Sequence, residues 1–146
     1  MNIIHTDLIW PKRKNVEEIR NGIREGKVLL YPCDTCWALT TGLSSAKGIE
    51  KIYEIKQRPS TMPVSLAFSD IIQVEKYVHL DKKSRDFIEH SMPERLTLIL
   101  PIKKEMFPLG FFTLNDTVGV RIPKDTFTRK LAQALNEPII TTSANI

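Results

Sequence analysis

Residues 15–32, NVEEIRNGIREGKVLLYP, join a helical pattern to a strand pattern, and this junction decides the fold class. Apolar residues recur at helical spacing in the first half, which predicts a helix capped by Asn15 and ended by Gly26. The apolar run at 27–31 is closed by a proline and predicts a strand buried on both faces. Because helix-like and strand-like periods keep alternating along the chain, the sequence predicts an α/β fold.

The other expected elements follow from the same periodicities. A helix that begins at Ser44 or Ser45 must end before Pro59, because proline cannot continue it. Further helices are expected at 70–78, 81–91 and 126–135, and strands at 64–68, 96–100, 117–122 and 139–142. The long segment between the strands at 96–100 and 117–122 contains three phenylalanines, which indicate either a hydrophobic lid or a satellite core: Phe107, Phe111 and Phe112.

Length and composition indicate one ordinary globular domain. The chain has 146 residues, of which 42% are hydrophobic and 26% charged, so disordered, collagen-like and extended coiled-coil proteins are excluded. The net charge of +4 suits an anionic small ligand or RNA but requires neither. No apolar stretch reaches membrane-spanning length and the first ten residues lack a secretory pattern, so we expect a cytoplasmic protein with no membrane partner.

Common phosphate-binding and metal-binding motifs are missing from the sequence. The six glycines form neither a dinucleotide-binding nor a P-loop pattern. The three histidines, His5, His79 and His90, are too dispersed to form a recognisable metal cluster, so no protein-built metal site is expected.

Two polar pairs with one residue between their members are the informative features. Lys56 and Arg58 precede Pro59, which disfavours helical backbone at Arg58, so an extended segment would point both cations the same way. Ser143 and Asn145 follow the last expected strand, at the end of a sheet where ligands bind in open α/β folds. The two cations suit phosphate or carboxylate, and the two neutral groups suit phosphate oxygens or a sugar. The alternative is a solvated helix end and an ordinary turn.

Five segments in order resemble the YrdC-like family, the threonylcarbamoyl-AMP synthases. They are VLLYPCDTCWAL at 28–39, KQRP at 56–59, LTLILP at 96–101, VGVRIP at 118–123 and TTSAN at 141–145. The resemblance covers residues 16–146, and the Lys-x-Arg and Ser-x-Asn signatures of the family fall on the two polar pairs. It implies a twisted, mixed, mostly parallel open sheet flanked by helices.

The resemblance also implies an activity and its site. Such enzymes join L-threonine, bicarbonate and ATP, with Mg²⁺, into threonylcarbamoyl-AMP for a tRNA modification. By resemblance, Lys56 and Arg58 are catalytic and bind ATP together with Ser143 and Asn145. The threonine site is carried over onto three residues, Thr35, Thr97 and Arg121. The implied macromolecular partners are tRNA or double-stranded RNA and other tRNA-modification proteins.

Departures from the family pattern leave alternatives open. Trp37 and Ala38 stand where the family usually has tyrosine and glycine, which affects the expected amino-acid specificity. Members continue beyond Ser-x-Asn, so we expect residues 1–146 to be a single domain shortened at its carboxyl end, and a homologue that binds without turnover is one alternative. The others are a non-catalytic RNA- or tRNA-binding protein, a carbamoyl-transferring hydrogenase-maturation domain, and a thiol-redox protein using Cys33 and Cys36.

Overall fold

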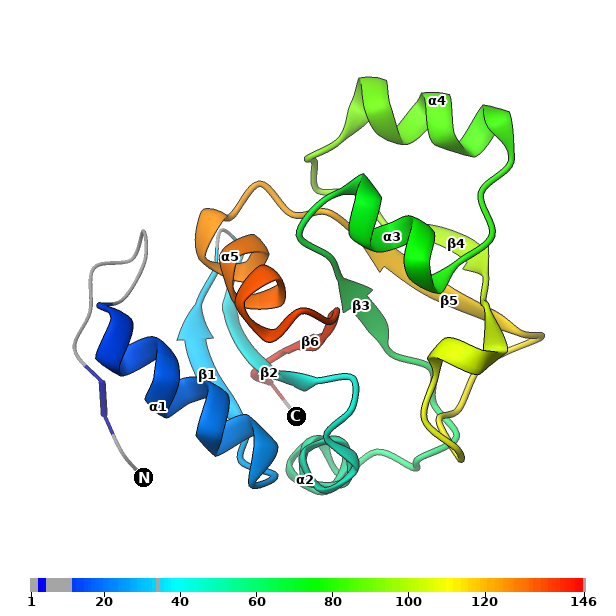
Figure 1. The fold of residues 1–146 in the computed structure, drawn as a ribbon. Coiled ribbons are helices and arrows are strands. Elements are labelled where there is room, and N and C mark those ends of the chain that lie inside the picture. The colour runs from blue at the N-terminus through cyan, green and yellow to red at the C-terminus, as the bar shows by residue number, and fades with distance from the viewer. Residues whose placement is uncertain (1–2, 5–11, 34, 146) are drawn as a thin grey trace.

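The computed structural model describes residues 3–4, 12–33 and 35–145, which form one mixed α/β sheet with helices around it (Figure 1). The helices are α1 (Arg13–Arg24), α2 (Ala46–Lys56), α3 (Ile71–Tyr77), α4 (Lys82–Ser91), the short 3-10 helix η1 (Lys104–Met106) and α5 (Thr126–Leu135). The strands are β1 (Leu29–Pro32), β2 (Trp37–Gly42), β3 (Ser65–Ala67), β4 (Leu98–Pro101), β5 (Thr117–Arg121) and β6 (Ile139–Ser143).

The six strands lie in the order β1-β2-β6-β3-β5-β4, and their directions correct one expectation. An open, mixed sheet flanked by helices is confirmed, but among the described pairings β3 and β5 are parallel and the other four pairs are antiparallel. The reason is local at one edge, because β1 and β2 are joined by a short turn that only antiparallel strands permit. At the centre, β6 inserts between β2 and β3 and runs opposite to both.

Two hydrophobic cores lie on opposite faces of the sheet. Neighbouring residues of one strand point to opposite faces, and Leu66 belongs to the core formed with α2, α3 and α4, whereas Ala67 belongs to the core formed with α1 and α5. Ile140 and Ile139 divide in the same way along β6. The two central strands β3 and β6 are therefore held from both sides, and their ends are fixed in position.

Several predicted boundaries and environments need correction. The helix α1 begins at Arg13, and Asn15 lies in its first turn because the carbonyl oxygen of Lys12 accepts the first helical hydrogen bonds. Gly26 ends it in the left-handed conformation, as expected, with φ +86°. The strand β1 lies at the sheet edge, so the prediction of burial on both faces is wrong, and Leu30 is 45% exposed.

Local capping signals were more reliable than burial. The carboxylates of Asp70 and Asp81 accept hydrogen bonds from the first turns of α3 and α4, as predicted. Helix α5 is capped by Asp125, one residue before the expected Thr126. Phe107 packs on Tyr77 and Phe111 packs on Phe107, and both lie against the larger core, so these two phenylalanines extend that core and do not form a separate satellite core. Among the described residues no helix combines the length and apolarity needed to span a membrane.

Candidate functional site

The end of α2 and the end of β6 meet through Lys56. Its ammonium group donates a hydrogen bond of 2.8 Å to the carbonyl oxygen of Ser143 and one of 2.9 Å to Oδ1 of Asn145. It also donates to the carbonyl oxygen of Asn145, and the Ser143 hydroxyl donates to the same Oδ1. The structure thus brings together three of the four residues of the two polar pairs, which lie almost 90 residues apart in sequence.

The backbone around Lys56 differs from the extended geometry expected for this segment. Lys56 is the last residue of α2, and Gln57 ends the helix in the left-handed conformation with φ 50°. The helix therefore directs the Lys56 side chain inward, where the residue is 3% exposed, while Arg58 is exposed. The inference that both cations point the same way from an extended segment is not supported, because the two residues stand on different backbone and in different environments.

The ammonium group of Lys56 is desolvated, and each of its three N–H donors has an oxygen acceptor. Burial lowers its pKa below that of an ordinary lysine, and the positive charge of Arg58 lowers it further. A lysine ammonium has three N–H donors, and all three find oxygens of Ser143 and Asn145. Lys56 therefore positions the end of β6, and an anion could bind the ammonium only by replacing one of these oxygens.

The turn between β1 and β2 lies beside the same corner. The backbone N–H of Ala144 donates to the carbonyl oxygen of Trp37 at 2.7 Å, which joins the start of β2 to the end of β6. Thr35 is exposed in this turn, with its hydroxyl 3.4 Å from the Cys33 sulfur and donating to the Cys36 sulfur at 3.7 Å. Asp34, part of the family-like motif, lies outside the described residues.

Thr97 and Arg121 lie farther along the sheet. The β4–β5 register pairs Leu98 with Val120, so Thr97, just before β4, is aligned with Arg121. Arg121 in turn pairs with Ala67 of β3, two strands away from β2, and its Nε is buried without a hydrogen-bond partner in the described part of the chain. Thr97 is exposed. The structure therefore places Thr97 and Arg121 together. Arg121 lies on β5, two strands away from β6, the strand whose end Lys56 contacts.

A row of small residues across the sheet was missed by the sequence reasoning. Thr141 of β6 pairs with Ser65 of β3, which pairs with Gly119 of β5. A Cβ atom at Gly119 would lie 2.7 Å from the Ser65 hydroxyl oxygen and 3.1 Å from the Thr97 methyl group. The available signal was the isolated glycine inside a strand, which often marks a close approach to the backbone.

The Cys33–Cys36 pair occupies a hairpin turn. The backbone N–H of Cys33 donates to the carbonyl oxygen of Cys36 at 2.9 Å, and β2 follows directly. Redox Cys-x-x-Cys motifs of the thioredoxin type open a helix whose positive end activates the thiol, and this chain has a strand there. The placement does not support a thioredoxin-like function.

We expect Thr35→Val to raise the pKa of the Cys33 thiol. Burial raises that pKa, but hydrogen bonds from Thr35 and from Cys36 outweigh it, so the net pKa lies below the ordinary value. Removing the Thr35 hydroxyl removes part of the lowering. The measurement is the rate of iodoacetamide alkylation against pH in a Cys36→Ser background. Thr97→Val, an exposed threonine elsewhere, serves as the control, and an unchanged alkylation profile in Thr35→Val would contradict this account.

The described residues contain no group of three or more His, Cys, Asp or Glu side chains that could hold a metal ion. Mg²⁺ commonly binds through substrate phosphates with one or two carboxylates rather than in an all-protein cage. Among the residues that the structure describes, the side chains gathered here do not form a protein-built magnesium site.

Fold and site together define a class: a mixed α/β protein with a lysine, a serine and an asparagine gathered at the end of a central strand. The sequence pattern of the Sua5/YciO/YrdC family, described as telomere recombination, matches residues 21–146. The chain belongs to this family.

Curated relatives extend the comparison. A protein of Methanocaldococcus jannaschii, provisionally named a threonylcarbamoyl-AMP synthase, is 31% identical over 135 residues, which are 92% of this chain and 62% of that protein. The threonylcarbamoyl-AMP synthase of Bacillus subtilis is 30% identical over 125 residues, which are 85% of this chain and 36% of that protein. The chain thus spans under two thirds of the length of both relatives.

Solved structures share the fold. P. abyssi Sua5 complexed with L-threonine matches 97% of this chain, and 43% of its own length, with a TM-score of 0.81 and 27% identity. E. coli YciO matches 94% of this chain and 69% of its own length with a TM-score of 0.78 at 24% identity, a likeness of fold.

Proposed function

We propose that this chain carries the nucleotide and amino-acid site of a threonylcarbamoyl-AMP synthase. The observation that carries the proposal is the meeting of Lys56 with Ser143 and Asn145 at the end of β6, close to exposed Arg58 and the β1–β2 turn. Relatives named for this activity, and a Sua5 relative complexed with L-threonine, support the substrate class. The recipient tRNA, any double-stranded RNA, the partner proteins and a cytoplasmic location belong to the same proposal.

The proposed reaction requires that the substrates be positioned and that the negative charge of the phosphates be neutralised. The amine of L-threonine adds to carbon dioxide derived from bicarbonate and loses a proton, which gives a carbamate. A carbamate oxygen then attacks the α-phosphorus of ATP, a new P–O bond forms, and the bond to pyrophosphate breaks. Negative charge gathers on the departing pyrophosphate, so cationic side chains near it lower the barrier.

The residues have distinct proposed roles. Arg58 is exposed and offers a planar fork for phosphate or carboxylate oxygens. Lys56 would exchange one of its contacts at the end of β6 for a phosphate oxygen, and the released Ser143 or Asn145 group would then face the nucleotide. Thr35, Thr97 and Arg121 remain the proposed threonine contacts. Mg²⁺ would enter with the triphosphate and neutralise part of its charge.

Pyrophosphate release tests the proposal. With ATP and Mg²⁺ present, release is expected to require both L-threonine and bicarbonate and to fall in Asn145→Ala. Asn21→Ala, at an exposed asparagine on α1, is the matched control. Release that depends on neither co-substrate would refute the catalytic proposal. Retained ATP binding without release would instead indicate a homologue that binds without turnover, and RNA binding under those conditions would favour the non-catalytic alternative.

A further inference from the structure

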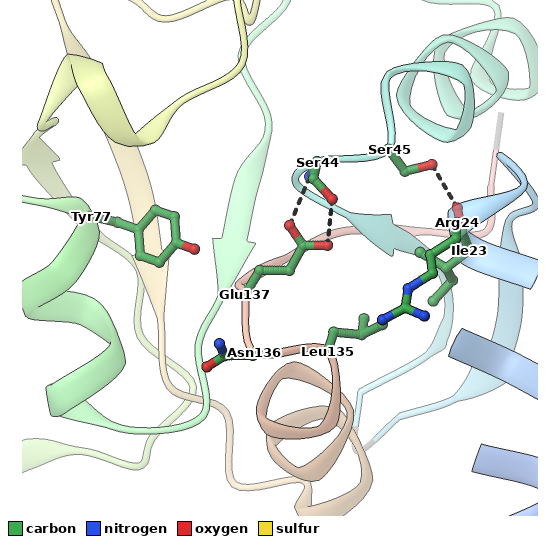
Figure 2. Close-up of a pocket in the computed structure, with 8 residues that line it drawn as sticks. All are labelled: Ile23, Arg24, Ser44, Ser45, Tyr77, Leu135, Asn136 and Glu137. Atoms are coloured by element: carbon green, nitrogen blue, oxygen red, sulfur yellow. Dashed lines mark hydrogen bonds between the residues drawn. The ribbon is translucent and has the colours of Figure 1, made fainter. Parts of the chain in front are cut away.

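A cavity lies at the start of β6, at the opposite end of that strand from Ser143. It has a volume of about 350 Å³, within the range of small-molecule sites, and is bordered by the ends of α1, α3 and α5 and by the turn after β2 (Figure 2). Glu137, two residues before β6, projects into its centre, with Tyr77 on one side and Arg24 on the other (Figure 2). The residues assigned above to nucleotide and threonine do not line it.

The carboxylate of Glu137 is held in a fixed position. The backbone N–H of Ser44 donates to Oε2 at 2.9 Å, and the Ser44 hydroxyl donates to Oε1 at 2.9 Å. A Cβ atom at residue 42 would collide with this carboxylate, so glycine there leaves the space that the carboxylate occupies. An ionised carboxylate can accept about four hydrogen bonds. Glu137 therefore keeps accepting capacity for a group in the cavity.

The charge of Glu137 has no ion-pair partner within the described ranges. Burial raises the pKa of this carboxyl group, while the hydrogen bonds from Ser44 and the positive charge of Arg24 oppose the rise. Arg24 is exposed and faces the carboxylate from α1 without forming a salt bridge. A partly desolvated carboxylate of this kind gains most from a cation that also donates hydrogen bonds.

Tyr77 adds a hydroxyl group to the wall of the cavity. The residue is 8% exposed, and its hydroxyl points into the cavity toward Glu137 (Figure 2). No residue that the structure describes forms a hydrogen bond with this hydroxyl. The hydroxyl lines the cavity and is accessible from it, so it can donate to or accept from a polar group there. The side chain of Asn136 adds an amide group at the same wall.

We propose that this cavity binds a small zwitterion, a molecule with a primary ammonium and a carboxylate such as a free amino acid. The ammonium has three donors for Glu137, Tyr77 and Asn136. The carboxylate of the bound molecule lies toward Arg24. A dication would be repelled by Arg24, and a simple anion by Glu137, so the two opposite charges select a molecule that carries both.

Nuclear magnetic resonance of the Ser44 amide tests the proposal directly, because this N–H donates to Glu137 and reports on its charge and surroundings. The probe is β-alanine, with ethylammonium and propionate as single-charge controls. We expect a saturable shift of the Ser44 signal with β-alanine and a much weaker response to either control. Bound ammonium should also lower the pH at which Glu137 titrates, with Arg24 and Tyr77 as the other ionisable groups facing it.

Two variants separate binding from folding. Glu137→Gln keeps an oxygen for Ser44 but removes the charge, and should weaken β-alanine binding by about tenfold or more. Tyr77→Phe leaves the Ser44 contacts intact and should weaken binding by several-fold, about the effect of one neutral hydrogen bond. Exposed Glu50→Gln is the matched control. Absence of a β-alanine shift in the unsubstituted chain, or an equal shift with ethylammonium, would overturn the proposal, whatever the outcome of the pyrophosphate assay.

Discussion

Replacing Lys56 with methionine is expected to weaken ATP binding on the order of a hundredfold, the upper end for a lost charge-assisted hydrogen bond. Methionine keeps the length and apolar stem of the side chain but removes the ammonium that the proposal gives to phosphate. The substitution also leaves oxygens of Ser143 and Asn145 without their donor, so the unfolding free energy should fall by roughly 1–3 kcal/mol. Equilibrium ATP binding and chemical denaturation measure the two effects.

The pH dependence of binding distinguishes a direct phosphate contact from a purely positioning role. Because burial and Arg58 lower the pKa of Lys56, the ammonium loses its proton at a lower pH than the ordinary lysine value of 10.5. ATP affinity in the unsubstituted chain should decrease as pH rises through that lowered pKa, and the decrease should disappear in Lys56→Met. Lys51→Met, an exposed lysine on the same helix, controls for lost charge. Wild-type ATP affinity in folded Lys56→Met would refute the assignment.

Arg58→Ala is expected to weaken ATP binding by about tenfold to a hundredfold while leaving stability almost unchanged. Arg58 is exposed, and its side chain makes no hydrogen bond or ion pair with the residues described here, so the loss of that side chain should change the unfolding free energy by less than about 0.5 kcal/mol. A guanidinium on a phosphate group is worth more, since the pair is charge-assisted and often bidentate. Arg58→Ala should therefore lower ATP affinity without lowering the unfolding free energy, whereas loss of a structural residue would lower the unfolding free energy.

Arg58→Lys refines this second prediction. A lysine keeps the charge but lacks the planar fork, so ATP affinity should fall between that of the wild type and that of Arg58→Ala. Lys83→Ala, an exposed cation on α4, should bind ATP as the wild type does. A loss of affinity in Lys83→Ala as large as in Arg58→Ala would show that net charge, and not this position, matters.

Local signals accounted for much of the fold. Asp70 and Asp81 cap helices because a short acidic side chain reaches the N–H groups of the next turn. Gly26 and Pro59 limit helices because of their own backbone constraints. Both kinds of interaction are completed within a few residues, so they are visible in the chain before it folds.

Strand direction and burial depend on partners far away in sequence. The apolar run that forms β1 is as hydrophobic as an interior strand, yet β1 pairs with β2 alone and Leu30 stays half exposed. The residues of β1 do not indicate that the other neighbour of β2 is β6, which leaves β1 at the edge of the sheet. The mostly parallel sheet that the resemblance implied is therefore wrong, whereas the α/β class that the sequence predicted is right.

The sequence by itself determined the α/β class, most helix limits and the two polar pairs, because spacing and capping act over short distances. Tertiary structure alone decided that Lys56 turns inward and uses its three donors on the end of β6, since Ser143 and Asn145 reach it only through sheet pairing. It also decided that Arg24 at the end of α1, Tyr77 at the end of α3 and Glu137 between α5 and β6 surround one cavity. What a charged group or a hydroxyl can bind depends on its neighbours, and only the packing of the folded chain brings those neighbours together.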